Sequence, residues 1–486
     1  MKKLISFISF VLVVIFLMGS VPAFGEGNME WTEFHKEDTI VRDGFTFDVG
    51  GLYACESWEE DEFLYKAAEV VKYTGDDETV TVPGEIDGYK VWCIRGGAFD
   101  NVPAKKIILP DNLERLTSWA FENCPNLQTI VFGKAAPTEI EPSWDILPCT
   151  RNCPSFKRFV VANDNLIYAT IDDGVLIRDS KISGYDYNKM IMDYPEGRPS
   201  DSYYLRKEVR YASQHSFAYT SNLKYVSFGY NKMHLSEFIF ADSSVAAVML
   251  DAKCVPSGYA FDYSNVKYVF YKGTKEQWKD RLGTFSDHFR SDCVKDKDIK
   301  VIYNAKDVEK VFTDVSTSAW YRGATEFAYN AGLMDGVAKD RFGPGDPETR
   351  AMLVATLWRL EGKPKAKTKA PFTDLKQDWY IPAVNWAYEK GIVDGLTKTK
   401  FSPGGTLTRE QLATIMYRYA EYKKLDTKAR ADLSGYKDAS KIHSYAKDAV
   451  SWAVASGLIK GTAPKKLSPL GITTRAQVAT ILLRQA

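Results

Sequence analysis

Two hydrophobic periodicities divide the chain, and the first lies between Gly51 and Asn304. Apolar residues recur there in triplets spaced apolar-x-x-apolar-x-apolar, each preceded by a phenylalanine five or six positions earlier. The triplets are Ala104, Ile107, Leu109; Leu127, Ile130, Phe132; Leu223, Val226, Phe228; Val245, Val248, Leu250; and Val266, Val269, Tyr271, with Phe99, Phe121, Phe217, Phe240 and Phe261 before them. Contiguous triplets start 21 to 23 residues apart. This period predicts a leucine-rich solenoid, in which each unit adds one short strand and a turn.

The second periodicity is helical and occupies the last third of the chain. Three segments each contain an amphipathic helix, a Gly-apolar-x-x-Gly turn, a Phe/Leu-x-Pro loop and a second helix that opens with Thr-Arg. The second helices begin TRAMLV at Thr349, TREQLA at Thr408 and TRAQVA at Thr474. The pattern therefore predicts an all-α module of three repeats. Helical spacing also predicts that the aromatic residues in the middle of the first helices face its core, namely Phe327, Trp386 and Trp452.

The N-terminus has the pattern of a secretory signal. Lys2 and Lys3 precede an apolar run from Leu4 to Met18, and small residues precede a cleavage site near Gly25. We therefore expect residues 1–25 to be removed. The remaining chain has no stretch of about 20 apolar residues, so we expect no membrane span after cleavage. These features predict a secreted protein of the cell surface.

Charge is distributed unevenly along a chain whose net charge is zero. From Asp307 onward there are 28 Lys and Arg against 19 Asp and Glu, a net charge of +9, which leaves −9 for residues 1–306. An acidic partner therefore suits the C-terminal part. For an exported protein, a wall polymer fits this requirement better than nucleic acid does.

Cysteine usage does not indicate a disulfide framework or a metal site. All seven cysteines lie before Asp307 and are scattered. Cys149 and Cys153 lie close together, but no second Cys or His pair is near them to complete four ligands. We expect either a local disulfide or two buried thiols at this pair, and no metal or cofactor.

The Thr-Arg pair that opens each second helix combines a cap with a poorly placed charge. Threonine before an apolar helical run is an N-cap, and Gln411 and Gln477 complete capping boxes after Thr408 and Thr474. The arginine that follows faces the positive end of the helix dipole, which is unfavourable. Free N–H groups and a guanidinium together suit a carboxylate or phosphate. The alternative is that each arginine pairs with a nearby acid: Asp314, Asp374 or Asp438.

Both periodic regions resemble known bacterial families. The segment GGAFDNVPAKKIILPDNLERLTSWAFENCPNLQTIVFG at 96–133 resembles BspA-like leucine-rich repeats of surface proteins. The three helical segments are similar to S-layer homology (SLH) domains, because every block of that motif occurs in order three times. The expected organisation is a multidomain chain with a lead-in at 26–50, a leucine-rich-repeat domain at 51–306, and SLH repeats at 311–361, 372–421 and 433–486.

The second resemblance implies a binding site. SLH domains are three-repeat modules that bind secondary cell-wall polysaccharides, commonly pyruvylated, whose carboxylate is held by the Thr-Arg arginine in grooves between repeats. The implied residues are Arg350, Arg409 and Arg475, the turn glycines Gly332, Gly336, Gly391, Gly395, Gly457 and Gly461, and the aromatic residues Trp320, Trp379 and Tyr445. The aromatic rings would stack on sugar, or else pack at the start of the first helix. Because the third repeat has Tyr445 in place of tryptophan, we expect its groove to be the weakest or altered.

These patterns predict a noncatalytic surface protein, anchored to the cell wall through its SLH repeats. The leucine-rich repeats would serve adhesion or binding of an unknown protein or glycan. The motifs Gly-x-Ser-x-Gly and His-Glu-x-x-His are absent, and the acidic pair Asp172 and Asp173 falls in a predicted turn. The alternatives are a structural S-layer subunit or, with less support, a wall-anchored enzyme.

Overall fold

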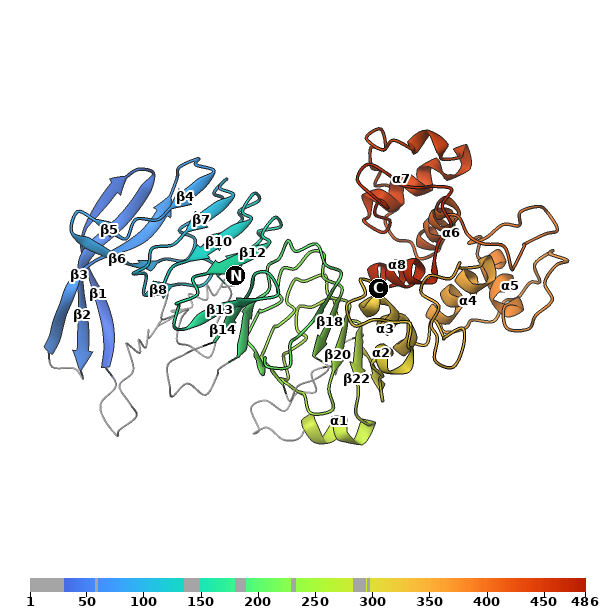
Figure 1. The fold of residues 1–486 in the computed structure, drawn as a ribbon, viewed down its shortest axis with the longest axis horizontal. Helices are drawn as coiled ribbons and strands as arrows, with labels where there is room; N and C mark the ends of the chain where they lie inside the picture. Colours follow the sequence, from blue (N-terminus) through green and yellow to red (C-terminus); the bar gives the residue numbers. More distant parts are fainter. Residues whose placement is uncertain are drawn as a thin grey trace, which may run out of the picture.

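The computed structural model describes residues 30–56, 60–134, 149–179, 189–228, 233–282, 294 and 298–486. The predicted signal peptide, Cys293 and the side chain of Cys55 lie outside the described residues. The molecule is elongated, with long strands at one end, a solenoid in the middle and helices at the other end (Figure 1). Among the described residues, no helix is long and apolar enough to cross a membrane.

A meander of long antiparallel strands precedes the solenoid. It consists of β1 (Glu30–Arg42), β2 (Phe45–Glu56) and β3 (Glu60–Tyr73). Strand β3 then pairs in parallel with β6 (Tyr89–Ile94), which also pairs with β5 (Glu85–Ile86) and β8 (Arg115–Leu116). The first solenoid turns are therefore continuous with the meander, and the meander covers their open end.

The first half of the solenoid contains a parallel sheet, here called the first sheet. Its strands are β4 (Thr79–Thr81), β7 (Lys106–Ile108), β10 (Thr129–Phe132) and β12 (Arg158–Val161). A short pair, β9 (Phe121–Glu122) and β11 (Thr150–Arg151), lies on another side of the same turns. The predicted triplets at Ala104 and Leu127 are buried, and Phe99 stacks on Phe121 with ring centroids 5.3 Å apart. The predicted solenoid unit is confirmed here.

A hairpin interrupts the solenoid in the region where the repeats are least regular. Strands β13 (Tyr168–Ile171) and β14 (Val175–Arg178) are antiparallel, and their turn contains Asp172 and Asp173 as expected. Strand β15 (Met190–Asp193) pairs with β14 and restarts parallel pairing. It leads a side sheet that continues through β17 (Tyr211–Ala212), β19 (His234–Leu235) and β21 (Val255–Pro256).

The second half of the solenoid contains the second sheet. Its strands are β16 (Ser202–Tyr204), β18 (Tyr225–Phe228), β20 (Ala247–Leu250), β22 (Tyr268–Tyr271) and β23 (Lys300–Tyr303). Helix α1 (Lys275–Leu282) follows β22. The phenylalanines Phe217, Phe240 and Phe261 form a continuous stack inside the turns. All three predicted triplets of this half are buried.

The described cysteines are buried thiols. Cys149 and Cys153 form no disulfide among the described residues and are at most 2% exposed, and Cys93, Cys124 and Cys254 are buried to the same degree. Of the two alternatives for the Cys149 and Cys153 pair, the structure shows two buried thiols.

The C-terminal helices close into a ring of three repeats, here called the helical ring. After α2 (Val308–Val311), the paired helices of the repeats are α3 (Arg322–Asn330) with α4 (Arg350–Leu360), α5 (Ile381–Glu389) with α6 (Arg409–Tyr422), and α7 (Lys447–Ala455) with α8 (Arg475–Gln485). Helix α4 packs on α5, α6 on α7, and α8 returns to α3. Phe327, Trp386 and Trp452 lie in the core of this ring, which confirms their predicted burial.

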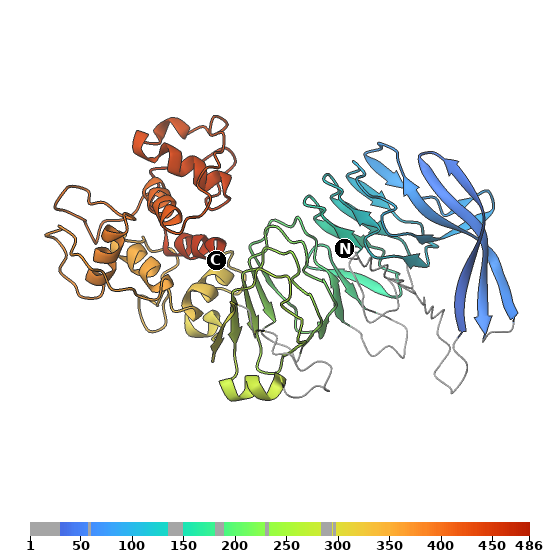
Figure 2. The same ribbon diagram turned by 180° about the vertical axis from the view of Figure 1, so that it is seen from behind.

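The helical ring and the second sheet share one hydrophobic core. Figure 2 shows α3 against the strands of the second sheet from behind, and α3 contacts both β16 and β18. Phe327 packs edge-on against Tyr268 at 5.2 Å and against Phe270 at 6.1 Å between ring centroids. A side chain at Gly323 would lie 2.6 Å from the Cβ of Ser202, so this close approach requires glycine. The two repeat systems therefore form one packed unit.

Candidate functional site

The Thr-Arg motif starts each second helix as the sequence predicts. Thr349, Thr408 and Thr474 are N-caps whose hydroxyl accepts a backbone N–H three residues later. The backbone N–H groups of Thr408 and Thr474 donate in return to the side-chain oxygens of Gln411 and Gln477, which completes two capping boxes, as expected. Each arginine is the first helical residue and is less than a tenth exposed.

The three arginines bind backbone carbonyl groups of the next repeat around the ring. Arg350 donates from Nε to the Phe401 carbonyl at 2.8 Å and from Nη2 to the Asp394 carbonyl at 3.2 Å. The other two repeat the arrangement: Arg409 with Leu467 (2.8 Å) and Lys460 (2.7 Å), and Arg475 with Phe342 (3.0 Å) and Asp335 (2.5 Å). The Arg475 guanidinium therefore joins the last repeat to the first. The sequence did not reveal these structural partners of the arginines, because the loops that the arginines bind lie more than 40 residues away along the chain.

The predicted acidic partners of these arginines have a different role. Asp314, Asp374 and Asp438 form no salt bridge with Arg350, Arg409 or Arg475 in the described chain. Each carboxylate instead accepts two backbone N–H groups of the Phe/Leu-x-Pro loop in its own repeat, at 2.7 to 3.0 Å: Phe342 and Gly343, Phe401 and Ser402, and Leu467 and Ser468. The aspartate thus fixes the loop whose carbonyl group the arginine binds. The alternative pairing is wrong.

The arginines are buried cations whose hydrogen bonds go to neutral carbonyl groups. Burial lowers the pKa of Arg350, Arg409 and Arg475 from the usual arginine value. Among the described residues, Nη1 of each makes no hydrogen bond, although Nη1 of Arg475 lies 3.9 Å from the Glu348 carboxylate. Carbonyl groups carry no net charge, so these hydrogen bonds do not neutralise the guanidinium groups. The carboxyl groups of Asp374, Asp438 and Glu348 act on Arg350, Arg409 and Arg475 without hydrogen bonding to them.

The chain segments before the arginines meet on the axis of the ring. The backbone N–H of Glu348 donates to Thr473, that of Thr473 to Leu407, and that of Leu407 back to Glu348, at 2.8 to 3.1 Å. The Glu348 carboxylate is fully buried there, without a hydrogen-bond partner in the described structure. Burial raises its pKa to about 7. No sequence pattern marks this residue, because its neighbours come from the other two repeats.

The six turn glycines have local structural reasons. Gly332, Gly391 and Gly457 end the first helices with φ near +70°, which favours glycine. A side chain at Gly336, Gly395 or Gly461 would approach carbonyl oxygens of its own loop to 2.8 Å or less. These features explain why glycine occupies all six positions, and no bound ligand is needed for the explanation.

The aromatic residues at the starts of the first helices lie on the surface. Trp320, Trp379 and Tyr445 are 64%, 45% and 56% exposed. Tyr445 is near enough to Arg350 for each group to influence the pKa of the other, although the two residues belong to the third and first repeats. The aromatic residue of one repeat is therefore a neighbour of the arginine of another repeat.

An additional acid lies next to Tyr445. Glu410, which is 2% exposed, accepts from the Tyr445 hydroxyl at 3.0 Å and from the His443 backbone at 3.1 Å, and its Oε1 lies 2.6 Å from His443 Nδ1. The first and third repeats have Ala351 and Ala476 at the corresponding position. The surroundings of Tyr445 thus include a carboxylate that the corresponding positions of the first and third repeats do not supply.

Comparison with known families agrees with this architecture. Residues 311–351, 371–413 and 435–479 match the S-layer homology domain, and residues 86–167 and 199–286 match the BspA type leucine-rich repeat region in six copies. The chain combines BspA-type leucine-rich repeats with three SLH domains. This composition assigns it to the cell wall and cell surface, and SLH domains imply binding of cell-wall polysaccharide.

Curated relatives share the SLH part with this chain. An endoglucanase of Bacillus sp. (strain KSM-635) is 32% identical over 171 residues, which is 35% of this chain and 18% of the relative. The surface-layer 125 kDa protein of Lysinibacillus sphaericus is 32% identical over 171 residues, covering 34% of this chain and 14% of the relative. The chain thus spans less than a fifth of the length of these two proteins.

Two solved structures have partial likeness to this chain. A leucine rich cell surface protein from Faecalibacterium prausnitzii is 14% identical, with coverage of 50% of this chain and 97% of that chain and a TM-score of 0.18. The pneumococcal vaccine antigen PcpA is 13% identical, with coverage of 55% and 98% and a TM-score of 0.20.

The third SLH repeat takes an acid from the solenoid. In the first two repeats the turn aspartate faces the arginine nine positions after the Thr-Arg arginine, as Asp394 does with Arg418 at 2.8 Å. The third repeat has Lys460 at the turn position, and its Arg484 pairs with Asp201 of the solenoid at 2.6 Å. Lys460 also contacts Asp201, at 3.3 Å. A residue of the leucine-rich repeats thus completes the third SLH repeat.

Proposed function

We propose that the chain is a noncatalytic surface protein held on the wall by an anionic secondary polysaccharide bound at the helical ring. The observation that carries the proposal is the combination of a buried guanidinium with an exposed aromatic ring. A carboxylate suits the cation, and a flat apolar face suits the sugar that bears it. A sugar that carries a pyruvate ketal would supply the carboxylate and the sugar ring on one residue of the polymer.

We further propose that the three positions are unequal and that the one at Arg350 is the weakest. From the pseudo-threefold relation of the ring we infer that Trp320 is the aromatic neighbour of Arg409 and Trp379 that of Arg475, as Tyr445 is near Arg350. Glu410 accepts a hydrogen bond from the Tyr445 hydroxyl, so its negative charge disfavours a carboxylate ligand at that aromatic ring.

The test is cosedimentation of the full mature chain with purified cell walls, before and after chemical removal of the secondary polysaccharide. The full chain is required because an isolated ring would expose the core that it shares with the second sheet. Binding should disappear with stripped walls. Undiminished sedimentation would overturn the proposal.

Aromatic substitutions test the site better than arginine substitutions, because the arginines also hold the ring together. Trp320→Ala and Trp379→Ala should each weaken wall binding about fivefold, the effect of roughly 1 kcal/mol. Tyr445→Ala is the matched control and should change binding less than about twofold. Equal effects at all three positions would contradict the ranking. Unchanged binding in the double tryptophan variant would remove the rings from the site.

A further inference from the structure

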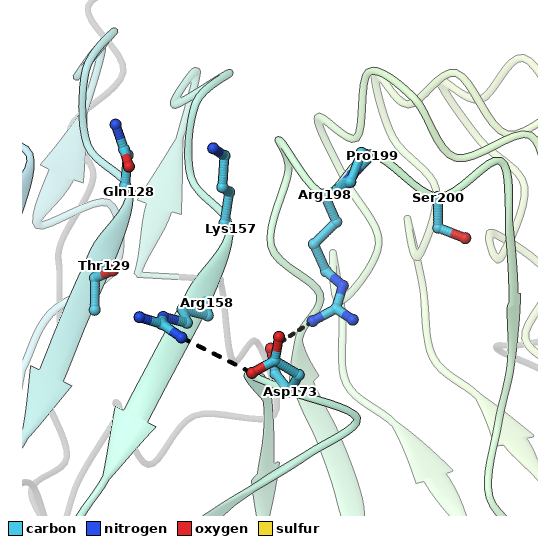
Figure 3. A pocket seen from close by; sticks show the side chains of 8 residues that line it. All are labelled: Gln128, Thr129, Lys157, Arg158, Asp173, Arg198, Pro199 and Ser200. Carbon is cyan, nitrogen blue, oxygen red and sulfur yellow. Dashed lines mark hydrogen bonds and ion pairs between the residues drawn. The ribbon is translucent and has the colours of Figure 1, made fainter. Parts of the chain in front are cut away.

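A cleft opens where the hairpin interrupts the solenoid, between the end of the first sheet and the start of the second. It encloses about 500 Å³. Its lining consists of Gln128, Thr129, Lys157, Arg158, Asp173, Arg198, Pro199 and Ser200. Figure 3 shows these side chains on both walls, with Asp173 on the hairpin turn at the base. No SLH residue contributes to this lining.

Three cations and one carboxylate line this cleft. Arg198 is fixed by bonds to the backbone carbonyl groups of Asp172 (2.6 Å) and Asp173 (2.8 Å), and its Nε is buried without a partner in the described structure. Arg158 lies 3.9 Å from the Asp173 carboxylate, which is 87% exposed, so this pair is weak. The Lys157 side chain makes no hydrogen bond or ion pair within the described chain. The cleft therefore has excess positive charge.

The positive charge of the cleft is opposite in sign to the net charge of the surrounding N-terminal part of the chain. Residues 1–306 have a net charge of −9, yet cations predominate among the lining residues. A general basic character of the domain therefore cannot explain the cluster. The remaining lining groups of Gln128, Thr129 and Ser200 are an amide and two hydroxyls, which can bond to several oxygen atoms of one ligand.

The lining also distinguishes between classes of ligand. Protein partners are usually anchored by aromatic or aliphatic side chains in desolvated pockets, and Pro199 is the one apolar residue here. A hydrophilic ligand with an acidic group and several hydroxyls fits better. We propose that this cleft binds an acidic saccharide, through a carboxylate or sulfate held by Lys157, Arg158 and Arg198. The leucine-rich repeats would then have a glycan site separate from the wall-binding ring.

The experiment is isothermal titration calorimetry on the mature chain carrying Trp320→Ala and Trp379→Ala, which should weaken binding at the ring. The probes are tetragalacturonate, a heparin-derived tetrasaccharide, neutral maltotetraose and tetraglutamate. The first two distinguish a carboxylate from a sulfate ligand. The chain should bind tetragalacturonate, the heparin-derived tetrasaccharide or both, and the affinity should fall as the salt concentration rises. It should not bind maltotetraose.

Three variants locate the binding. Arg158→Gln should weaken it about tenfold, because a charge-assisted contact is lost. Asp173→Asn should strengthen it about threefold, because the competing carboxylate is removed while asparagine tolerates the left-handed backbone at this position. Lys106→Gln is the matched control, since Lys106 occupies the same register of the first sheet two strands away and lies outside the cleft. It should leave the affinity unchanged.

Each opposing result overturns the proposal. Equal losses from Lys106→Gln and Arg158→Gln would show diffuse charge attraction and no site. Tetraglutamate binding as tightly as the acidic saccharides would assign the cleft to a protein partner. Failure of all acidic saccharides to bind would exclude the ligand class. None of these results depends on wall sedimentation, so the anchoring proposal stands or falls separately.

Discussion

The two parallel sheets of the solenoid are built from strands of the same kind, but their outer faces differ. In the first sheet the outer residues are Thr79, Thr81, Lys106, Ile108, Thr129, Val131, Arg158 and Val160, which are exposed or half-buried. In the second sheet β18 and β20 are buried on both faces. Their inner residues belong to the solenoid core, whereas the outer residues Tyr225, Ala247 and Met249 belong to the core of the helical ring.

The difference shows which part of the solenoid remains available to a ligand. Tyr225 and Tyr268 pack between the two repeat systems. Tyr225 and Tyr204 also donate to the buried carboxylate of Glu326 on α3, at 2.8 and 2.9 Å. The second sheet is thus a domain interface, while the first sheet and the adjoining cleft face solvent.

The largest effect should come from disrupting the packing of α3 on the outer face of the second sheet. Phe327→Ala removes the ring that packs on Tyr268 and Phe270, and should cost roughly 3–5 kcal/mol of unfolding free energy. Calorimetry should then show separate transitions for the ring and the solenoid. Trp386→Ala, at a core position of the ring away from the solenoid, should destabilise without freeing the solenoid from α3. An unchanged melting temperature for Phe327→Ala would contradict the shared core.

The same interface should depend on pH. Burial raises the pKa of Glu326 to about 7, above its value in the unfolded chain, so the native state binds this proton more tightly. Stability from this group is therefore present at low pH and is lost as pH rises from about 4.5 to about 7. Glu326→Gln should stabilise the protein by roughly 2 kcal/mol at pH 8 and have little effect at pH 4. The measurement is the melting temperature of the unmodified chain and of Glu326→Gln across this pH range. If the two melting temperatures change with pH in parallel, Glu326 is not the group responsible.

A smaller effect should follow from the ion pair at the edge of the interface. Asp201→Asn leaves Arg484 and Lys460 without their acid, and should cost roughly 1 kcal/mol. Asp335→Asn is the control, because its 3.7 Å pair with Arg359 involves a carboxylate that is 76% exposed and should contribute almost nothing. Urea unfolding of both variants checks this difference. Equal losses would mean that Asp201 acts as an ordinary surface charge.

The smallest effect should come from a substitution on the outer face of the first sheet, which faces solvent. Val160 is on the outer face of β12 and is 39% exposed, so Val160→Ala should change the unfolding free energy by less than about 0.5 kcal/mol. Val248→Ala, on the buried inner face of β20, should cost several times more in the same urea titration. A large loss at Val160 would indicate that the first sheet is also covered.

Several features could be predicted from the sequence because they depend on neighbouring residues. The buried triplets, the stacked phenylalanines and the threonine caps follow from spacing within one repeat. The roles of Arg350 and Tyr445 could not be assigned in this way, because each acts in another repeat. The long meander and the cleft were also missed, since no periodic pattern marks an interruption.

Spacing along the chain was enough to predict the two repeat systems, their solenoid and helical classes, and which side chains each repeat buries. It could not predict that the ring closes from Arg475 onto the first repeat, that Asp201 completes the third repeat, or that the second sheet is covered. Periodicity records which face of an element is apolar. It does not record which distant surface covers that face, and that surface is selected by packing across the whole chain.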